Sequence, residues 1–600
     1  MQMLLIVLGT AVFLSLAYRI YGPILERLFQ LDNRRATPAV SMRDDVDYAP
    51  CATPSLLNQH FSAIAAAGPI VGPILAGLYW GWGPALLWIL LGSVFIGGVH
   101  DFSALVASIR HRATSITMVV RAHVSRRAYL VFQIFVYMAL MYIIVAFTDI
   151  TATMFVGAID LKSDKSFSSL SAALAQEGAD PSMIFQSGSV ATSSLLYLVL
   201  PFLMAPLLLR GRLTTWSALV FFGPLAVLAI LAGPYLPLNV DVLLQRWQPD
   251  LTPAQASALA IRCWNVFLLL YCAVASVLPT WLLLQPRGIL GGGFMFAALG
   301  SCALGIISSS IAGTNSINLP MFRGLTPDGA DPLFPFLFIT IACGACSGFH
   351  SLIASGTTSK QLPAECSARP IGYGAMLLEG MVAVLSLCCV MLLSPDSPLT
   401  KASPNFIYAS GISSFLAVLG LDPAVGLLFA LMAFNTFVYD TLDTCTRLGR
   451  FIIQELTGFR GAPGRWLGTI ISTVIPLYFV TRPTTSGKPI WREFWGLFGA
   501  SNQLLAALSL LAVTVWLWRT RRVVWAFYLT GIGGLVMYIM SFWALISLLK
   551  ARMQNLSDPV VWIAVLLLVL AAAMLVEAVA ALLGRQEPAE PEATPVPIEA

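Results

Sequence analysis

Long apolar runs separated by short polar segments dominate the chain as far as residue 584. Most of these runs have the roughly 20 residues that an α-helix needs to cross about 30 Å of hydrocarbon. About fifteen runs reach this length, at residues 3–24, 60–80, 83–110, 128–158, 189–210, 214–236, 262–284, 288–313, 333–357, 371–394, 422–450, 463–481, 491–518, 523–549 and 559–584. A further run, 405–419, is too short to cross and is predicted to be re-entrant or interfacial. The pattern predicts an all-α polytopic membrane protein with about 15 transmembrane helices.

Two of the runs lose their helical character half way. The first break lies at residues 60–72, HFSAIAAAGPIVG, where glycine and proline gather. The second lies within 334–361, FPFLFITIACGACSGFHSLIASGTTSKQ, which begins as an apolar helix and becomes rich in glycine, serine and threonine. Inside a bilayer, backbone leaves helical geometry only where protein or a water-filled cavity satisfies it, so such breaks are typical of transporter binding sites. Loosened packing of two ordinary helices is the alternative.

The distribution of charge predicts the topology. Only 10% of the 600 residues are charged and 58% are hydrophobic, which excludes an ordinary soluble globule. Lys and Arg are concentrated in alternate loops, most densely at 110–127 and 519–522, which favours a cytoplasmic C-terminus and an N-terminus outside. The first run lacks a positive n-region and is predicted to be an uncleaved span. The tail from 585 to 600 is rich in Pro, Glu and Ala and is predicted to be disordered.

With this topology, the two broken spans run in opposite directions through the membrane. Antiparallel broken helices indicate an inverted repeat, the sequence sign of a secondary transporter. No GxxxxGK[ST] loop, GxSxG or HExxH motif is present, so neither an ATP-driven pump nor a membrane hydrolase is supported, and we predict that the chain is not an enzyme. The ten cysteines lie mostly in apolar runs and are interpreted as small packing residues. Cys343 and Cys346 have CxxC spacing with His350 one turn on, and a metal site there is the less favoured alternative.

Ionisable residues within the spans are costly and therefore mark candidate functional positions. The candidates are His60, His100, Asp101, Asp149, His350, Glu379, Asp440 and Asp443. Glu379 lies about 12 Å along its helix, too deep to snorkel easily, so it is a candidate for the coupling proton. A neutral glutamic acid hydrogen-bonded between helices is the equal alternative.

The other candidates have more than one interpretation. Asp443 and Arg447 are spaced i,i+4, which predicts a structural ion pair or, alternatively, an inner gate, with Asp440 one turn nearer the membrane centre. His350 lies in the second break, where it is suited either to contact a carboxylate substrate and relay a proton or to pack. His100 and Asp101 are adjacent and do not face one another on a helix, so we do not expect a coupled pair.

Several long motifs resemble one family. They are NQHFSAIAAAGPIVGPILAG, INLPMFRG, FPFLFITIACGACSGFHSLIASGTTSKQL, IGYGAMLLEG, TLDTCTRLGRFIIQE and FWGLFGASNQLLAALSLL. These motifs resemble the carbon starvation protein A (CstA) family over residues 45–520. The resemblance implies a transporter of the bacterial inner membrane that responds to starvation stress. It also implies the amino acid–polyamine–organocation superfamily, a leucine-transporter-like inverted-repeat core and extra helices. Gln59, His100 and Cys445 stand where the family pattern leads us to expect His, Gln and Gly, which bears on substrate more than on fold.

Members of the resembled family are linked to uptake of peptides, and some to pyruvate in symport with protons. We therefore predict a proton-coupled importer of peptides or a small carboxylate, with an uncoupled channel, facilitator or membrane sensor as the alternative. No cofactor or metal is expected, and the partners are the small-molecule substrate and the lipid bilayer rather than nucleic acid. The predicted divisions are an N-terminal helix and loop (1–58), the transporter core (59–520), C-terminal helices (521–584) and the tail (585–600).

The predicted sites follow from the breaks and the buried charges. The substrate site is expected at Ala67, Gly68, Pro69, Gly348, His350, Ser351, Ser355, Gly356, Thr357 and Thr358. Proton coupling is assigned to Glu379, Asp440 and His350, and the gate or structural pair to Asp443 and Arg447. Backbone N–H groups and half-helix N-termini in the breaks are expected to hold a substrate carboxylate, together with the serine and threonine hydroxyls.

Overall fold

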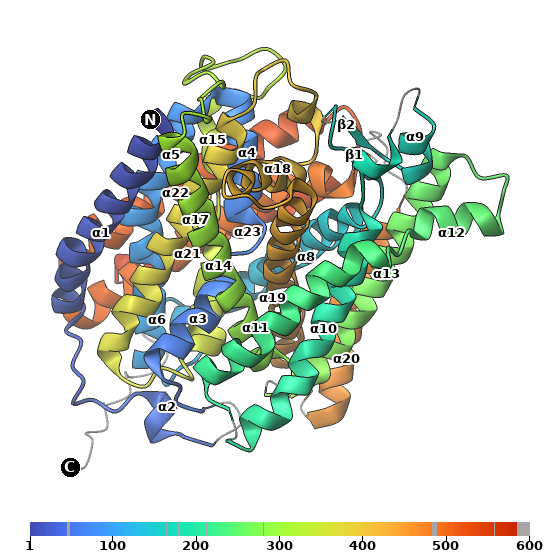
Figure 1. Cartoon of the computed structure of the whole chain (residues 1–600). Helices are drawn as coiled ribbons and strands as arrows, with labels where there is room; N and C mark the ends of the chain where they lie inside the picture. The colour runs from blue at the N-terminus through green and yellow to red at the C-terminus, as the bar shows by residue number, and fades with distance from the viewer. Residues whose placement is uncertain are drawn as a thin grey trace.

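The computed structural model describes residues 1–44, 48–163, 165–176, 180–211, 213–279, 281–459, 461–482, 489–556 and 558–584. The apolar runs form one closely packed bundle of helices (Figure 1). Within the described ranges, twelve helices are long and apolar enough to cross a membrane, or thirteen if the bent pair α3–α4 counts as one span. The predicted polytopic helical architecture is confirmed, whereas the count of about 15 spans is not.

The bounds of the elements follow the apolar pattern. The long helices are α1 (Gln2–Phe29), α8 (Arg126–Met154), α10 (Gly188–Leu209), α11 (Thr215–Ala232), α13 (Pro253–Val277), α14 (Leu284–Ile311), α17 (Ala375–Met391), α19 (Pro423–Thr457), α20 (Gly461–Thr481), α21 (Ile490–Arg521), α22 (Ile532–Arg552) and α23 (Pro559–Leu582). Helices α5 (Trp82–Gly92) and α6 (Gly98–Arg110) are joined by a π-helical turn and together form one span, Trp82–Arg110. The shorter helices are α2 (Pro38–Ser41), α3 (Thr53–Ile64), α4 (Gly68–Trp80), α7 (Ile116–His123), α9 (Leu170–Leu174), α12 (Val240–Trp247), α15 (Leu333–Thr340), α16 (Gly348–Ile353) and α18 (Pro404–Ala417). A small antiparallel sheet of order β2-β1-β3 lies between α8 and α10, formed by β1 (Ala158–Asp160), β2 (Lys165–Phe167) and β3 (Ile184–Gln186).

Three predicted spans account for the difference between fifteen and twelve. The run 60–80 is the bent pair α3–α4, the run 333–357 is broken into α15 and α16, and the run 463–481 forms α20, which is long enough but less apolar than the twelve. The short run 405–419 forms the 14-residue helix α18, which is largely buried against α19. The predicted tail lies outside the described residues.

Both predicted breaks are present. Helix α3 ends at Ile64 and α4 begins at Gly68, with an angle of 46° between them. Helix α15 ends at Thr340, and regular helix resumes only at Gly348. The glycine-rich and proline-rich stretches therefore mark real interruptions in the two helices.

The two broken helices run antiparallel. At one end, the segment before α3 pairs with the segment after α16, because Ala49 and Cys51 donate backbone bonds to the carbonyls of Lys360 and Gln361 at 3.2 and 3.0 Å. At the other end, the last residue of α4, Trp80, donates its indole N–H to the carbonyl of Asp331, just before α15, at 2.8 Å. The opposite directions predicted from the topology are thus confirmed by contacts at both ends.

The basic loops gather at one end of the bundle. Arg110 donates to the carbonyl of Gln30 at 3.1 Å, and Arg519 donates to the carbonyl of His123 at 2.7 Å. These contacts join the loops around 30, 110–127 and 519–522, which the charge pattern assigns to the same side. The β-sheet lies toward the opposite end (Figure 1). Which of these ends faces the cytoplasm stays a prediction.

Glycines let neighbouring helices close in on the second break. A Cβ on Gly97 would overlap the carbonyl oxygen of Ala345, and a Cβ on Gly499 would overlap that of Ile339. A Cβ on Gly68 would likewise overlap the Cys343 side chain. Backbone from three neighbouring segments therefore approaches the unwound segment more closely than any other residue type would permit.

This packing predicts that Gly97→Ala destabilises the protein by about 1–3 kcal/mol, because the added methyl group must displace backbone. Thermal unfolding in detergent would measure the loss as a lower Tm. Gly300→Ala is the matched control, because Gly300 lies in helix α14 with nothing within 4 Å of its Cβ position. An equal Tm for the two variants would contradict the close packing described above.

Candidate functional site

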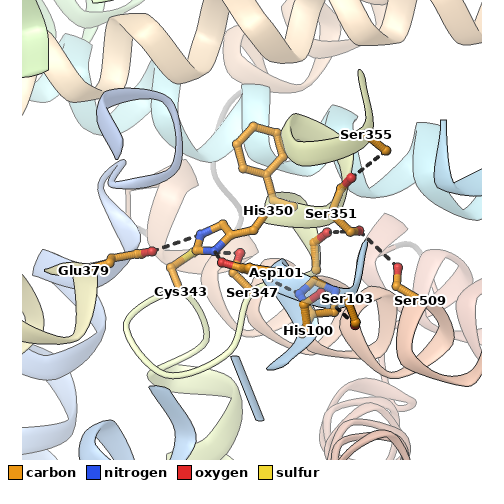
Figure 2. Close-up of polar contacts among 12 residues, drawn as sticks. His100, Asp101, Ser103, Cys343, Ser347, His350, Ser351, Ser355, Glu379 and Ser509 are labelled. Atoms are coloured by element: carbon orange, nitrogen blue, oxygen red, sulfur yellow. Dashed lines mark hydrogen bonds and ion pairs between the residues drawn. The ribbon is translucent and has the colours of Figure 1, made fainter. Parts of the chain in front are cut away.

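A cluster of buried ionisable side chains lies at the second break (Figure 2). The Asp101 carboxylate, on α6, is 2.7 Å from Nδ1 of His350 on α16 and 2.7 Å from Nδ1 of its neighbour His100. All three side chains are fully buried. The expectation that His100 and Asp101 do not form a pair is wrong, because Nδ1 lies close enough to the backbone for adjacent side chains to meet without sharing a helix face.

The shared carboxylate determines which nitrogens carry hydrogen. With Asp101 ionised, its carboxylate only accepts hydrogen bonds, and both imidazoles then donate Nδ1–H to it. When these rings are neutral, Nε2 of each is a lone-pair acceptor. Asp101 therefore leaves the Nε2 atoms of His100 and His350 as the positions at which a proton can be gained.

Glu379 completes this cluster from α17. Its Oε2 atom is 3.1 Å from Nε2 of His350, and both side chains are fully buried. The pair lacks hydrogen-bond geometry, and within the described part of the chain His350 Nε2 and both Glu379 oxygens have no hydrogen-bond partner. A single proton between Nε2 and Oε2 would convert this approach into a charge-assisted hydrogen bond. The depth predicted for Glu379 is thus confirmed, and its partner is the histidine of the break.

Asn502 on α21 supports the unwound backbone. Its Oδ1 accepts from the backbone N–H of Phe349 at 2.9 Å, and its Nδ2 donates to Ser347 Oγ at 3.0 Å and to Cys343 Sγ at 3.4 Å. The amide therefore takes the place of helical partners that the break removes. Sequence reasoning did not single out this residue, although an Asn-Gln pair inside an otherwise apolar run was a signal for it.

The first break faces the second. Ala67 precedes the first residue of α4, Gly68, which packs against Cys343, and Pro69 packs against Gly344. Gly348, the first residue of α16, packs on the opposite side against Asn502. The predicted residues of the two breaks are therefore brought together around the unwound segment.

The predicted hydroxyl residues extend from this point toward the end of the bundle that carries the basic loops. Ser351 shares a hydrogen bond with Ser509 at 3.0 Å, and Ser355 accepts from the backbone N–H of Ile116 at 3.1 Å. Thr357 donates to the carbonyl of Ile353 at 3.0 Å. These three side chains thus form hydrogen bonds within the protein, and they do not converge on His350.

His60 links the two broken helices. Its Nδ1 is 2.8 Å from Thr358 Oγ1, and its Nε2 has no hydrogen-bond partner among the described residues. His60 and Thr358 line a narrow cavity of about 20 Å³ that also reaches Asp440. A larger cavity of about 310 Å³ is lined by Ser355 and Gly356 together with Lys360 and Glu455. Both cavities lie toward the end of the bundle that carries the basic loops.

Asp440 belongs to a second buried cluster, centred on Arg287. The guanidinium Nε of Arg287 is 2.5 Å from Asp440 Oδ1, and Nη1 forms an ion pair with Asp443 and a hydrogen bond with Tyr271. Ser62, at the end of α3, donates to the other oxygen of Asp440. This cluster therefore ties helix α3 to α14 and α19.

Arg287 was missed by the sequence analysis, which placed it in a short loop between two spans. The structure instead puts it in the first turn of α14 with a fully buried side chain. The ion-pair partner that the structure gives Asp443 is thus Arg287. Arg447, the predicted partner, donates to the carbonyls of Ala275 and Leu278 at 2.9 and 2.7 Å.

A model of one protein family matches most of the chain. It is described as carbon starvation protein CstA and matches residues 1–407 and 395–544. The chain belongs to the CstA family.

Relatives of this CstA family member are named as transporters. The peptide transporter CstA of Helicobacter pylori strain J99 is 30% identical over 576 residues, covering 86% of this chain and 78% of the relative. The pyruvate/proton symporter BtsT of Escherichia coli is 29% identical, covering 90% of this chain and 81% of the relative. Together with the spans, these matches identify a multi-pass protein of the bacterial inner membrane.

Solved structures are more distant. A crystal structure of the Eremococcus coleocola manganese transporter, in complex with an aromatic bis-isothiourea substituted compound, covers 90% of this chain and 98% of its own. Its TM-score is 0.47 and its identity 13%, a level that bears on no detail of the fold or function.

The described residues of this CstA family member contain no group of three or more His, Cys, Asp or Glu side chains placed to hold a metal ion.

The Arg287 cluster predicts that Arg287→Met destabilises this CstA family member by about 3–5 kcal/mol, because two buried carboxylates lose their counter-charge. Thermal unfolding would detect the change. The triple variant Arg287→Met, Asp440→Asn and Asp443→Asn should recover much of the loss, and Arg492→Met, at an exposed position, is the neutral control. A triple variant as unstable as the single one would show that the charges are not the cause.

Proposed function

We propose that this protein is a secondary active transporter that imports peptides or a small carboxylate such as pyruvate by proton symport. The observation that carries the proposal is the buried pair of His350 Nε2 and Glu379 Oε2 at the break, 3.1 Å apart and without other hydrogen-bond partners among the described residues. The names of the relatives, peptide transporter CstA and pyruvate/proton symporter BtsT, support this class of substrate and this coupling ion.

The finer architecture that we propose is a leucine-transporter-like core with inverted repeats. The antiparallel pairs α3–α4 and α15–α16 would be equivalent broken helices of the two repeats, which is the usual arrangement around a midplane site. If both broken pairs and α20 cross the bilayer, the chain has the predicted 15 spans. The core then comprises residues 59–520, with α22 and α23 outside it.

The charge of the His350 cluster explains how binding of a proton and binding of an anionic substrate would each favour the other. If Asp101 and Glu379 are both ionised and the imidazoles are neutral, the cluster has a charge of −2, which repels a carboxylate. A proton taken up between His350 and Glu379 reduces this charge to −1 and lowers the repulsion. Because the coupling is reciprocal, bound substrate also favours proton uptake, which is the requirement for symport.

We place the substrate beside the two facing breaks. The N-terminus of α4, which begins at Gly68, supplies the positive end of a helix dipole next to Cys343 and the His350 cluster. Ser355 and Gly356 line the cavity of about 310 Å³, and Thr357 and Thr358 line the narrow one, so we assign them to the exit path. The protein would open on one side of the membrane and then on the other, which would expose this site to each side in turn.

The remaining carboxylates take different roles in the proposal. Asp440 and Asp443 already have Arg287 as counter-charge, whereas the described residues give Glu379 no counter-charge, so we assign the coupling proton to Glu379. Arg447 joins α19 to the end of α13. We assign these contacts to the inner gate, because they hold the end of the bundle that carries the basic loops.

Uptake into proteoliposomes tests the substrate and the coupling. Labelled pyruvate and a labelled dipeptide would be offered with and without an inward proton gradient. We expect one of them to accumulate against its own gradient, and an uncoupler to abolish the accumulation. Entry of either compound only to equilibrium would instead favour a channel or facilitator.

A variant tests the proton site. Glu379→Gln should still permit substrate exchange but should lower gradient-driven accumulation to the level reached without a gradient, because the amide cannot take up the proton. The readouts are accumulation and its pH profile in proteoliposomes. Asp250→Asn, at an exposed position, is the control. Unchanged accumulation and pH profile in Glu379→Gln would exclude Glu379 from coupling.

A further inference from the structure

Arg19 on α1 is a charged residue without a partner. It lies inside the membrane-spanning helix Gln2–Phe29, its side chain is exposed, and the described residues form no hydrogen bond or ion pair with it. The nearby Arg369 is different, because it donates to Glu26 at 2.8 Å. A guanidinium inside a bilayer needs a counter-charge or access to the interface, and the described residues provide no counter-charge for Arg19.

A groove lined mostly by apolar side chains lies beside Arg19. It has a volume of about 550 Å³ and runs between α1 and α17. On α1 its lining extends from Ala11 to Arg19, and on the other side it extends from Gly374, just before α17, to Met381 on α17, mostly through apolar side chains. Eight residues of helix rise about 12 Å, so the groove is long and parallel to the helices.

The groove faces the hydrocarbon. Helix α1 lies at the edge of the bundle (Figure 1), and Leu5, Val12, Leu16 and Ile20 on it are at least half exposed. Such a row of exposed apolar side chains on a span is a surface for lipid. A lipid chain can therefore enter the groove sideways from the bilayer.

The position of Arg19 suits a phospholipid headgroup. The 28 residues of α1 are about 42 Å long, which exceeds the roughly 30 Å of hydrocarbon. If α1 is centred, Arg19 lies roughly 10 Å inside the boundary on the side of its C-terminus, and its long side chain can extend toward the phosphates. On the same side, residues 26–35 carry Arg27, Arg34 and Arg35 against Glu26 and Asp32, a net charge of +1 that favours a lipid with net negative charge.

We propose that the groove between α1 and α17 binds an anionic phospholipid, with one acyl chain along the groove and the phosphate paired with Arg19. Guanidinium and phosphate form bidentate charge-assisted hydrogen bonds, which suits an otherwise unpaired arginine. The site is separate from the His350 cluster and does not depend on the proposed transport activity. It would secure α1 to the face of the bundle that contains α17.

Thermal unfolding of the delipidated full-length protein tests the proposal. Phosphatidylglycerol should raise the Tm of the wild type more than phosphatidylethanolamine does, and Arg19→Gln should remove that difference. Arg262→Gln is the matched control, because Arg262 is also an exposed arginine on a span, α13, but does not line the groove. Native mass spectrometry should show one phosphatidylglycerol retained by the wild type and by Arg262→Gln, and lost from Arg19→Gln.

Two further measurements distinguish binding of a lipid in the groove from binding of phosphate alone. Ala11→Trp fills the groove while leaving Arg19 in place, and it should also lose the retained lipid. Inorganic phosphate at the same concentration should leave the Tm unchanged. The proposal is overturned if Arg19→Gln keeps the phosphatidylglycerol effect, if Ala11→Trp folds and retains the lipid, or if inorganic phosphate alone reproduces the shift.

Discussion

The unwound backbone at residues 341–347 is the constraint on which the rest of the structure depends. Peptide groups that leave a helix inside a bilayer must find other partners, because no water is available in hydrocarbon. The indole N–H of Trp88 donates to the carbonyl of Ile341 at 3.1 Å, and Asn502 accepts from Phe349. Polar side chains on α5 and α21 therefore supply hydrogen-bond partners to the backbone of the broken segment. Glycines at Gly97 and Gly499 let the same helices approach closely enough to supply these contacts.

The same break sets the direction of His350. Because α16 starts anew at Gly348, its side chains are not bound to the helical phase of α15. His350 can thus meet Asp101 on α6 and Glu379 on α17, two elements far apart in sequence. A continuous helix would leave these carboxylates buried without a common partner, which is costly in a membrane. The interruption and the buried charges are therefore parts of one arrangement.

The sequence predicted the features that depend on local pattern. The long helices follow from apolar runs of membrane length, and both breaks follow from glycine and proline within such runs. The distance of Glu379 from the start of its span, about 12 Å along the helix, also predicted that it lies deep in the membrane. The partners were not predictable in this way, because Arg287, Asn502 and the approach of His100 to Asp101 depend on contacts between distant helices or on side-chain conformation. Arg287 falls between the predicted spans 262–284 and 288–313, so the sequence pattern does not show that its side chain is buried. The three short strands escaped notice because they lie in a polar connection without an apolar run.

Helix α3 connects the second broken helix to the Arg287 cluster. On one side, His60 contacts Thr358 in the second broken helix, and on the other, Ser62 contacts Asp440 in the Arg287 cluster. These residues are two positions apart and lie just before the break at Ile64, so any swing of α3 about that break alters both contacts. Arg287 balances Asp440 whether or not a proton is present at Glu379, which makes its cluster suited to a fixed anchor. The His60–Thr358 contact has no such ion pair and is the weaker of the two. A swing of α3 would therefore break the His60–Thr358 contact before it disturbs the Arg287 cluster.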